Sequence, residues 1–109
     1  MKNQYIIILV TAKDKNEASK IAQGLLEAKL IACANIVNGL QSMFWWQDKI
    51  DTSKETLLIL KSKSSLFKKI EAKVKSLHSY QTPEIISISI TNGNADYLKW
   101  IDSSISKGA

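Results

Sequence analysis

The run of residues 4–11, Gln-Tyr-Ile-Ile-Ile-Leu-Val-Thr, is the feature that most constrains the fold of this chain. It is continuous, apolar and rich in β-branched residues, which is typical of a buried β-strand. A buried strand needs neighbouring strands and covering helices, so the rest of the chain must supply them.

Two segments have the 3.6-residue periodicity of amphipathic helices. The first begins at Asp14, with Glu17 three residues later in an Asp-x-x-Glu variant of the capping box. Gly24 lies inside this helix at a cost of about 1 kcal/mol relative to Ala, so we expect close packing there. The second helix is expected to be capped by Ser64 or Ser65, and it has an apolar face flanked by lysines: Leu66, Phe67, Ile70, Val74 and Leu77, with Lys68, Lys69, Lys73 and Lys75.

Three further strands are predicted. Residues 33–47 and 49–61 should form a long hairpin, with an irregularity near Asn38-Gly39 and a turn near Gln47-Asp48-Lys49. Residues 49–61 are apolar on both faces, which indicates a central strand or a subunit contact. Residues 84–91 form the last strand, a short helix begins at Asn94 or Asp96, and the tail at 103–109 is expected to fray.

The element order is therefore strand, helix, strand, strand, helix, strand, helix. This order predicts one α+β domain over residues 1–109, a ferredoxin-like βαββαβ sandwich with an antiparallel sheet and a short C-terminal helix. Two helices on one face leave the other sheet face uncovered. That face carries more Ile and Leu than a monomer tolerates in water, so we expect it, or the long hairpin, to contact other copies of the chain.

Composition excludes several classes of protein. No apolar run approaches the roughly 18 residues that cross a bilayer, and we find no signal-peptide pattern. A single cysteine forms no internal disulfide and fits a reducing compartment, so a cytoplasmic location without membrane contact is expected. The net charge is +5, but all 15 positive residues are lysines. Because arginine is the usual reader of guanine and phosphate, we expect no sequence-specific nucleic-acid binding.

The segment at residues 77–85 holds the only His and the only Pro of the chain. Imidazole is a common metal ligand, and Cys33, Glu55 and Glu84 are further partial ligands, with Asp48 and Asp51 near the turn. Each has a structural alternative. Cys33 could be a small buried apolar residue, His78 a cation at a helix C-terminus, and Glu84 a lysine partner.

The run Met43-Phe44-Trp45-Trp46 is the other unusual segment. In a strand its side chains alternate between the two faces, so both faces are bulky. The run fits a core and subunit interface, or the wall of a pocket for a flat ligand. The sequence has no Gly-rich phosphate loop, no Cys-x-x-Cys, no His pair and no arginine of the kind that small acyl-phosphate hydrolases of this architecture use.

The motifs taken together resemble the CutA family of divalent-cation tolerance proteins, over about Tyr5 to Ile101. Those that carry the resemblance are Ala32-Cys33-Ala34-Asn35-Ile36-Val37, Trp45-Trp46 with Lys49-Ile50, Glu55 with Lys61, His78-x-Tyr80-x-x-Pro83-Glu84-Ile85 and Tyr97-Leu98-x-Trp100-Ile101. Three positions depart from the usual family pattern: Ser79 replaces a Pro, Asp48 replaces a turn Gly, and a Pro often found near Asn38 is absent.

The resemblance implies a tight homotrimer built like the PII signal proteins, with no established enzymatic reaction and no required cofactor. It implies weak binding of a divalent metal, Cu or Zn, with Cys33 and His78 at positions of metal contact. It also places Glu55, Lys61, Tyr80 and Glu84 in the cleft between subunits, and we expect Glu84 or Glu55 to supply an oxygen ligand to the metal. Two alternatives stay open: a PII-like trimer in which Lys61, Trp46 and Tyr80 bind an anionic, flat ligand, and a structural or interaction trimer without a ligand.

Overall fold

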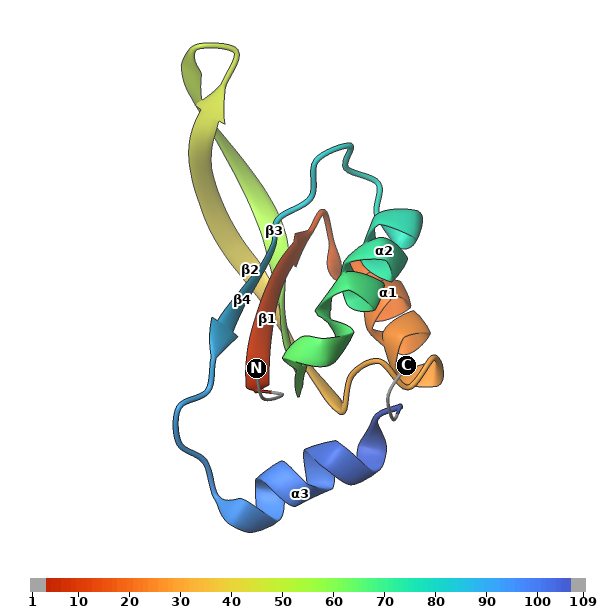
Figure 1. Cartoon of the computed structure of the whole chain (residues 1–109). Coiled ribbons are helices and arrows are strands. Elements are labelled where there is room, and N and C mark those ends of the chain that lie inside the picture. Colours follow the sequence, from red (N-terminus) through yellow and green to blue (C-terminus); the bar gives the residue numbers. More distant parts are fainter. Residues whose placement is uncertain (1–3, 107–109) are drawn as a thin grey trace.

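A computed structural model describes residues 4–106 of the chain (Figure 1). Its elements follow the predicted order, with a short 3-10 helix, η1, before the second α-helix. They are β1 (Tyr5–Ala12), α1 (Lys15–Glu27), β2 (Cys33–Trp46), β3 (Lys49–Lys63), η1 (Ser64–Leu66), α2 (Phe67–Leu77), β4 (Ile85–Ser89) and α3 (Ala95–Ser104).

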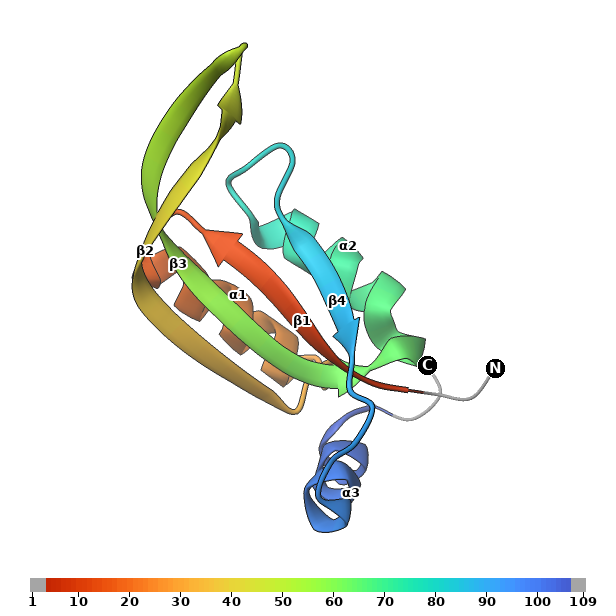
Figure 2. The ribbon, with the colours of Figure 1, turned by 90° about the vertical axis from the view of Figure 1, so that its left-hand side faces the viewer.

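The strands form one sheet in the order β2-β3-β1-β4, and every neighbouring pair is antiparallel. Helices α1 and α2 cover one face of this sheet, while α3 lies beyond its end (Figures 1 and 2). The predicted ferredoxin-like α+β fold with a C-terminal helix is confirmed. Strand β4 is shorter than the predicted 84–91.

The core lies between the sheet and the two helices. Ile8 and Val10 of β1 are fully buried and pair with Leu60 and Leu58 of β3, while Ile21 packs against them from α1. Burial alternates along β1 and β3, so one face of each strand points to the helices. Strand β3 is not buried on both faces within the protomer, although it has the predicted central position, whereas Val10, Thr11 and Ala12 at the end of β1 are all buried.

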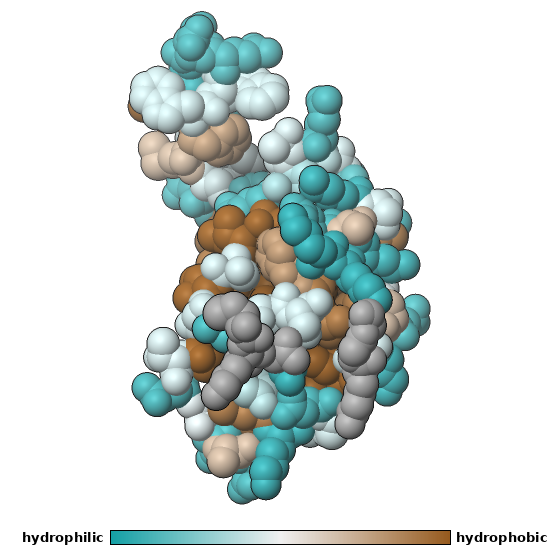
Figure 3. Space-filling view, viewed as in Figure 1, coloured by the Kyte–Doolittle hydropathy of each residue, from teal (hydrophilic) through white to brown (hydrophobic). Residues whose placement is uncertain are grey.

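The sheet face opposite α1 and α2 is here called the open face. Its members follow from the strand registers and the alternation of burial: Ile7, Leu9, Leu57, Ile59, Ile86 and Ile88. Ile86 and Ile88 are 49% and 51% exposed. Figure 3 shows apolar surface over the middle of the molecule, below the hydrophilic tip of the β2–β3 hairpin. The predicted uncovered apolar face is therefore present.

Local signals explain the start and packing of α1. The Asp14 carboxylate accepts a hydrogen bond from Glu17 N–H at 2.8 Å, as the capping box requires. A Cβ on Gly24 would lie 2.8 Å from Cδ1 of Leu77, so the glycine allows α1 and α2 to approach closely. This confirms the expected close packing at Gly24.

Two local predictions are wrong. Neither Ser64 nor Ser65 caps α2, because η1 precedes it, and the Ser64 hydroxyl instead accepts a hydrogen bond from Gln4 N–H. The described part of the 103–109 tail is held in place, since Ile105 is 7% exposed and Ser106 N–H donates to Lys29 O at 2.7 Å. Residues 107–109 lie outside the described part.

The β2–β3 hairpin extends well beyond the sheet (Figures 1 and 2). The register shifts between Val37 and Leu40, where Gly39 has a φ of +81°, so the predicted irregularity is a bulge built on glycine. At the tip, Gln47 and Asp48 have φ values of 50° and 64°, which makes a tight two-residue turn as predicted.

None of the described helices has the length and apolar character required to cross a membrane.

Candidate functional site

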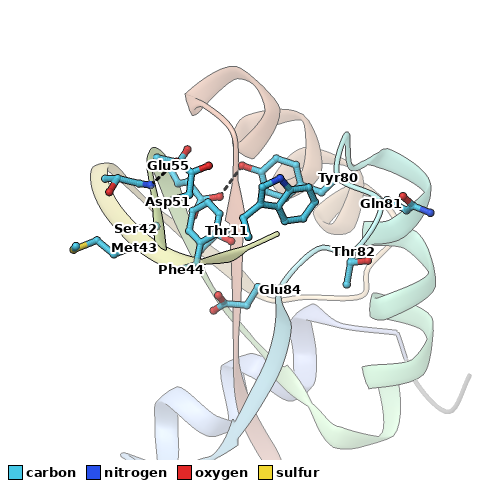
Figure 4. A pocket seen from close by; sticks show the side chains of 13 residues that line it. Thr11, Ser42, Met43, Phe44, Asp51, Glu55, Tyr80, Gln81, Thr82 and Glu84 are labelled. Carbon is cyan, nitrogen blue, oxygen red and sulfur yellow. Dashed lines mark hydrogen bonds between the residues drawn. The ribbon is translucent and has the colours of Figure 1, made fainter. Parts of the chain in front are cut away.

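A pocket of about 930 Å³ lies between the outer half of the β2–β3 hairpin and the loop that joins α2 to β4 (Figure 4). Four of the seven predicted site residues line it: Trp46, Glu55, Tyr80 and Glu84. They come from three separate segments of the chain. The fold therefore brings together most of the polar set that the sequence analysis placed in a cleft.

Alternate residues of the hairpin form one wall of the pocket. Phe44 pairs with Asp51 and Ser42 with Ser53, and all four line the pocket. Residues two apart in a strand share a face, so Glu55 continues the series along β3. The same alternation leads on to Leu57 and Ile59 of the open face. The pocket is thus the polar continuation of the apolar sheet face.

Tyr80 connects the two walls. Its hydroxyl donates a hydrogen bond of 2.6 Å to Oε2 of Glu55, visible as a dashed line in Figure 4. Burial raises the pKa of the Tyr80 phenol, and the negative charge of Glu55 raises it further. The phenol therefore stays protonated at neutral pH and holds the Glu55 carboxylate in one position.

His78 lies behind this wall, and its side chain has no exposed surface. The Nε2 atom is 2.7 Å from the carbonyl oxygen of Thr11, and Nδ1 accepts a hydrogen bond of 3.1 Å from Tyr80 N–H. These contacts fit the neutral imidazole with its proton on Nε2. Both nitrogens are occupied, so His78 could bind a metal only by losing one of these bonds. In this structure His78 holds the backbone of Tyr80 in place, and its role as a metal ligand stays a prediction.

Glu17 is a residue of the site that sequence reasoning missed. Its buried carboxylate accepts hydrogen bonds from Lys13 N–H at 2.9 Å and from Ser79 N–H at 2.7 Å. Burial alone would raise the pKa of Glu17, but the hydrogen bonds from Lys13 and Ser79 outweigh it and lower the pKa. Glu17 was assigned to the capping box alone. The sequence carries no signal that it also anchors the loop preceding Tyr80.

Cys33 and Lys61 lie elsewhere. They are directly opposite each other on β2 and β3, with Nζ of Lys61 3.9 Å from Sγ of Cys33, and the ammonium also donates to Asn35 Oδ1. Lys61 is six residues from Glu55, or about 20 Å along the strand. Within one chain Lys61 and Glu55 therefore do not line the same pocket. The prediction that Lys61 lies in a cleft between subunits stays a prediction, and it would require Lys61 of a neighbouring subunit.

The predicted ligands Cys33, His78 and Glu84 do not converge. Within residues 4–106 no three His, Cys, Asp or Glu side chains lie close enough together to hold one metal ion. The carboxylates of Asp51, Glu55 and Glu84 are distributed around the pocket, and no lysine of the described part of the chain lines it. A metal site with Cys33 and His78 remains a prediction that would require atoms from other copies of the chain.

Comparison with known proteins agrees with the fold and the motifs. Residues 6–104 match the model of the CutA1 divalent ion tolerance protein family. The divalent-cation tolerance protein CutA of Thermus thermophilus is 40% identical over 95 residues, which are 87% of this chain and 92% of the relative. Chloroplastic CutA 1 of rice is 39% identical over 91% of this chain, which spans only 56% of that relative.

Solved structures give the same result. The crystal structure of rice CutA1 superposes with a TM-score of 0.94 at 37% identity and covers 96% of both chains. The structure of the periplasmic divalent cation tolerance protein CutA from Archaeoglobus fulgidus has a TM-score of 0.91 at 41% identity, covering 94% of this chain and 99% of that one. The chain belongs to the CutA1 divalent ion tolerance family.

Proposed function

We propose that this protein acts in divalent-cation tolerance as a homotrimer that binds divalent cations weakly in clefts between its subunits. The observation that carries the proposal is the position of the pocket. Its three carboxylates, Asp51, Glu55 and Glu84, lie where the exposed apolar face of the sheet ends. An interface formed by that face would place the pocket at its edge.

Exposed apolar surface supports the assembly. Ile86 and Ile88 on the open face are about half exposed, and Met43, Trp45 and Ile50 on the hairpin are 69%, 74% and 63% exposed. Large exposed apolar patches of this kind mark contacts between proteins. Other copies of the same chain would cover this apolar surface, as the PII-like assembly implied by the family resemblance predicts.

The ligand atoms available explain why binding would be weak. Carboxylate oxygens bind divalent cations, but Cu²⁺ and Zn²⁺ gain most from imidazole and thiolate ligands. His78 has both nitrogens occupied, and Cys33 lies next to Lys61 outside the pocket. Glu84, Glu55 and Asp51 would therefore supply oxygen ligands, completed by groups of a neighbouring subunit. We propose no catalytic reaction at this site.

Two measurements on the same preparation test the proposal. Light scattering should give three times the chain mass of 12.2 kDa. Calorimetric titration with Cu²⁺ and Zn²⁺ should give weak, saturable binding that Glu84→Gln and Asp51→Asn reduce. The matched control is Asp48→Asn, which removes a carboxylate from the same hairpin outside the pocket. A stable 12.2 kDa particle, or equal affinities in all variants, would overturn the proposal.

The alternatives from the sequence receive less support. In the PII-like trimer Lys61, Trp46 and Tyr80 would bind an anionic, flat ligand. Lys61 lies about 20 Å from Glu55 along β3, so this lysine would have to come from a neighbouring subunit. A structural trimer without ligand would be favoured by a sealed, dry cleft, whereas this pocket is lined by polar side chains. A cytoplasmic location stays a prediction, and relatives are named as chloroplastic and periplasmic proteins.

A further inference from the structure

We propose that the pocket binds a linear aliphatic polyamine, whose ammonium groups contact the carboxylates while its methylene chain lies against the aromatic side chains. The inference shares with the proposed function only the location of the site and its preference for cations. It names a different class of ligand, an extended organic cation rather than a metal ion.

The charge of the pocket is the first argument. The chain has 15 lysines and a net charge of +5, yet none of the lysines within residues 4–106 lines the pocket. Three carboxylates do: Asp51, Glu55 and Glu84 (Figure 4). An acidic hollow on a basic protein selects cations, because anions are repelled locally and cations are repelled everywhere else.

The spacing of the carboxylates is the second argument. Asp51 and Glu55 share one face of β3 and are four residues apart, about 13 Å between their Cα atoms. Among residues 4–106 no three potential ligands are close enough to surround one metal ion. Glu55 is held in place by Tyr80 and cannot move freely toward Asp51. A ligand with several positive charges along a chain matches this separation better than a single ion does.

The aromatic side chains are the third argument. Phe44 and Trp46 occupy alternate positions on β2 and line the pocket with Tyr80. Trp46 is 60% exposed and Phe44 is 39% exposed, so both present surface to a ligand. Alkylammonium groups bind to aromatic faces through cation–π attraction, and methylene groups gain from apolar contact. A strongly hydrated metal ion uses neither contribution.

The size of the pocket agrees. Its volume of about 930 Å³ lies at the upper end of the usual range for organic ligands and far exceeds the space that an ion needs. Met43, Phe44 and Trp46 line the pocket beside carboxylates and hydroxyl groups, so the pocket offers both apolar and polar contacts to a small organic molecule.

Calorimetric titration of the full-length assembled protein with spermidine and 1,5-diaminopentane tests the inference. Tryptophan fluorescence gives a second readout of binding, and the Trp46→Leu variant identifies how much of the fluorescence change comes from the tryptophan in the pocket. We expect saturable binding of both amines, with spermidine tighter, and no binding of the uncharged 1,5-pentanediol. Glu55→Gln and Asp51→Asn should each weaken binding about tenfold, since each removes a charged hydrogen-bonding partner. Asp48→Asn, the matched control on the same hairpin, should leave affinity unchanged.

Two results would overturn the inference: no saturable binding of either amine, or an equal loss of affinity in Asp48→Asn and the pocket variants. The second would indicate general attraction to the hairpin. Titration with Cu²⁺ in the same preparation separates this inference from the proposed function. If Cu²⁺ binds and the amines do not, only the polyamine site is lost. If the amines bind with the expected carboxylate dependence and Cu²⁺ does not, the metal role is lost.

Discussion

Replacing His78 with Ala should destabilise the protein strongly and leave its metal affinity unchanged. The substitution removes a fully buried ring and leaves two groups without partners, the carbonyl of Thr11 and the N–H of Tyr80. An unsatisfied group in such a position costs about 1 kcal/mol or more, and the lost packing of the ring adds about 1–2 kcal/mol. The free energy of unfolding should therefore fall by about 3 kcal/mol.

His78→Gln is the matched variant. Its side-chain amide can donate to the Thr11 carbonyl as Nε2 does, but it does not supply the acceptor that Nδ1 gives to Tyr80 N–H. About half of the loss, roughly 1.5 kcal/mol, should remain. The assay is urea denaturation of all variants at one protomer concentration, because the stability of an oligomer depends on concentration. Cu²⁺ titration of the folded variants completes the test.

Two outcomes would refute this reasoning. A loss below about 0.5 kcal/mol in His78→Ala would mean that the buried hydrogen bonds contribute little. A tenfold or larger loss of Cu²⁺ affinity in His78→Gln, with stability retained, would make His78 a metal ligand after all. It would then have to release Thr11 or Tyr80 on binding, and the sequence-based prediction would be correct.

Three further predictions concern the backbone and Glu17. Asp48→Gly should raise the free energy of unfolding by about 1 kcal/mol, since Asp48 has a φ of 64°; thermal denaturation measures this. Gly39→Ala should lower the free energy of unfolding by about 1–2 kcal/mol, measured in urea. The φ of +81° disfavours any residue with a Cβ, and this backbone effect acts alone because no atom lies within 4 Å of the added methyl group. Folding lowers the pKa of Glu17 below 4.5. The contribution of the Glu17 carboxylate to the free energy of unfolding is therefore complete above pH 4.5 and is lost as the pH falls through the pKa of the folded state. Urea midpoints from pH 7 to 3 should therefore fall less steeply in Glu17→Gln than in the parent protein.

The parts of the fold that depend on local sequence could be predicted. The β-branched run in β1, the Asp14 cap and the glycine at position 39 each act through their own backbone or nearest turn, so their structural effects follow from residue type. The predictions at Ser64 and at the tail failed because tertiary contacts decided them. Ser64 bonds to the start of β1, and Ser106 bonds to Lys29 after α1.

The same distinction applies to the candidate site. Glu55 and Tyr80 were correctly grouped, but the sequence could not show that His78 is buried behind them, because its partner Thr11 lies 67 residues away in the chain. Counting along β3 could have shown that Lys61 and Glu55 of the same chain lie far apart. Six residues put both on one face of the strand but about 20 Å from each other.

The position of Lys61 on β3 determines the sign of the charge in the pocket, and this sign decides which ligands the pocket can bind. With Lys61 included, the cleft had a positive group and suited an anionic ligand. The strand geometry places that lysine beside Cys33 and Asn35, and leaves Asp51, Glu55 and Glu84 to define the pocket. Net charge could not have indicated this, because it sums over the whole surface while a ligand experiences only the groups within about a Debye length. A basic chain can therefore have a pocket lined by carboxylates, because the strand register keeps lysines such as Lys61 of the same protomer away from it.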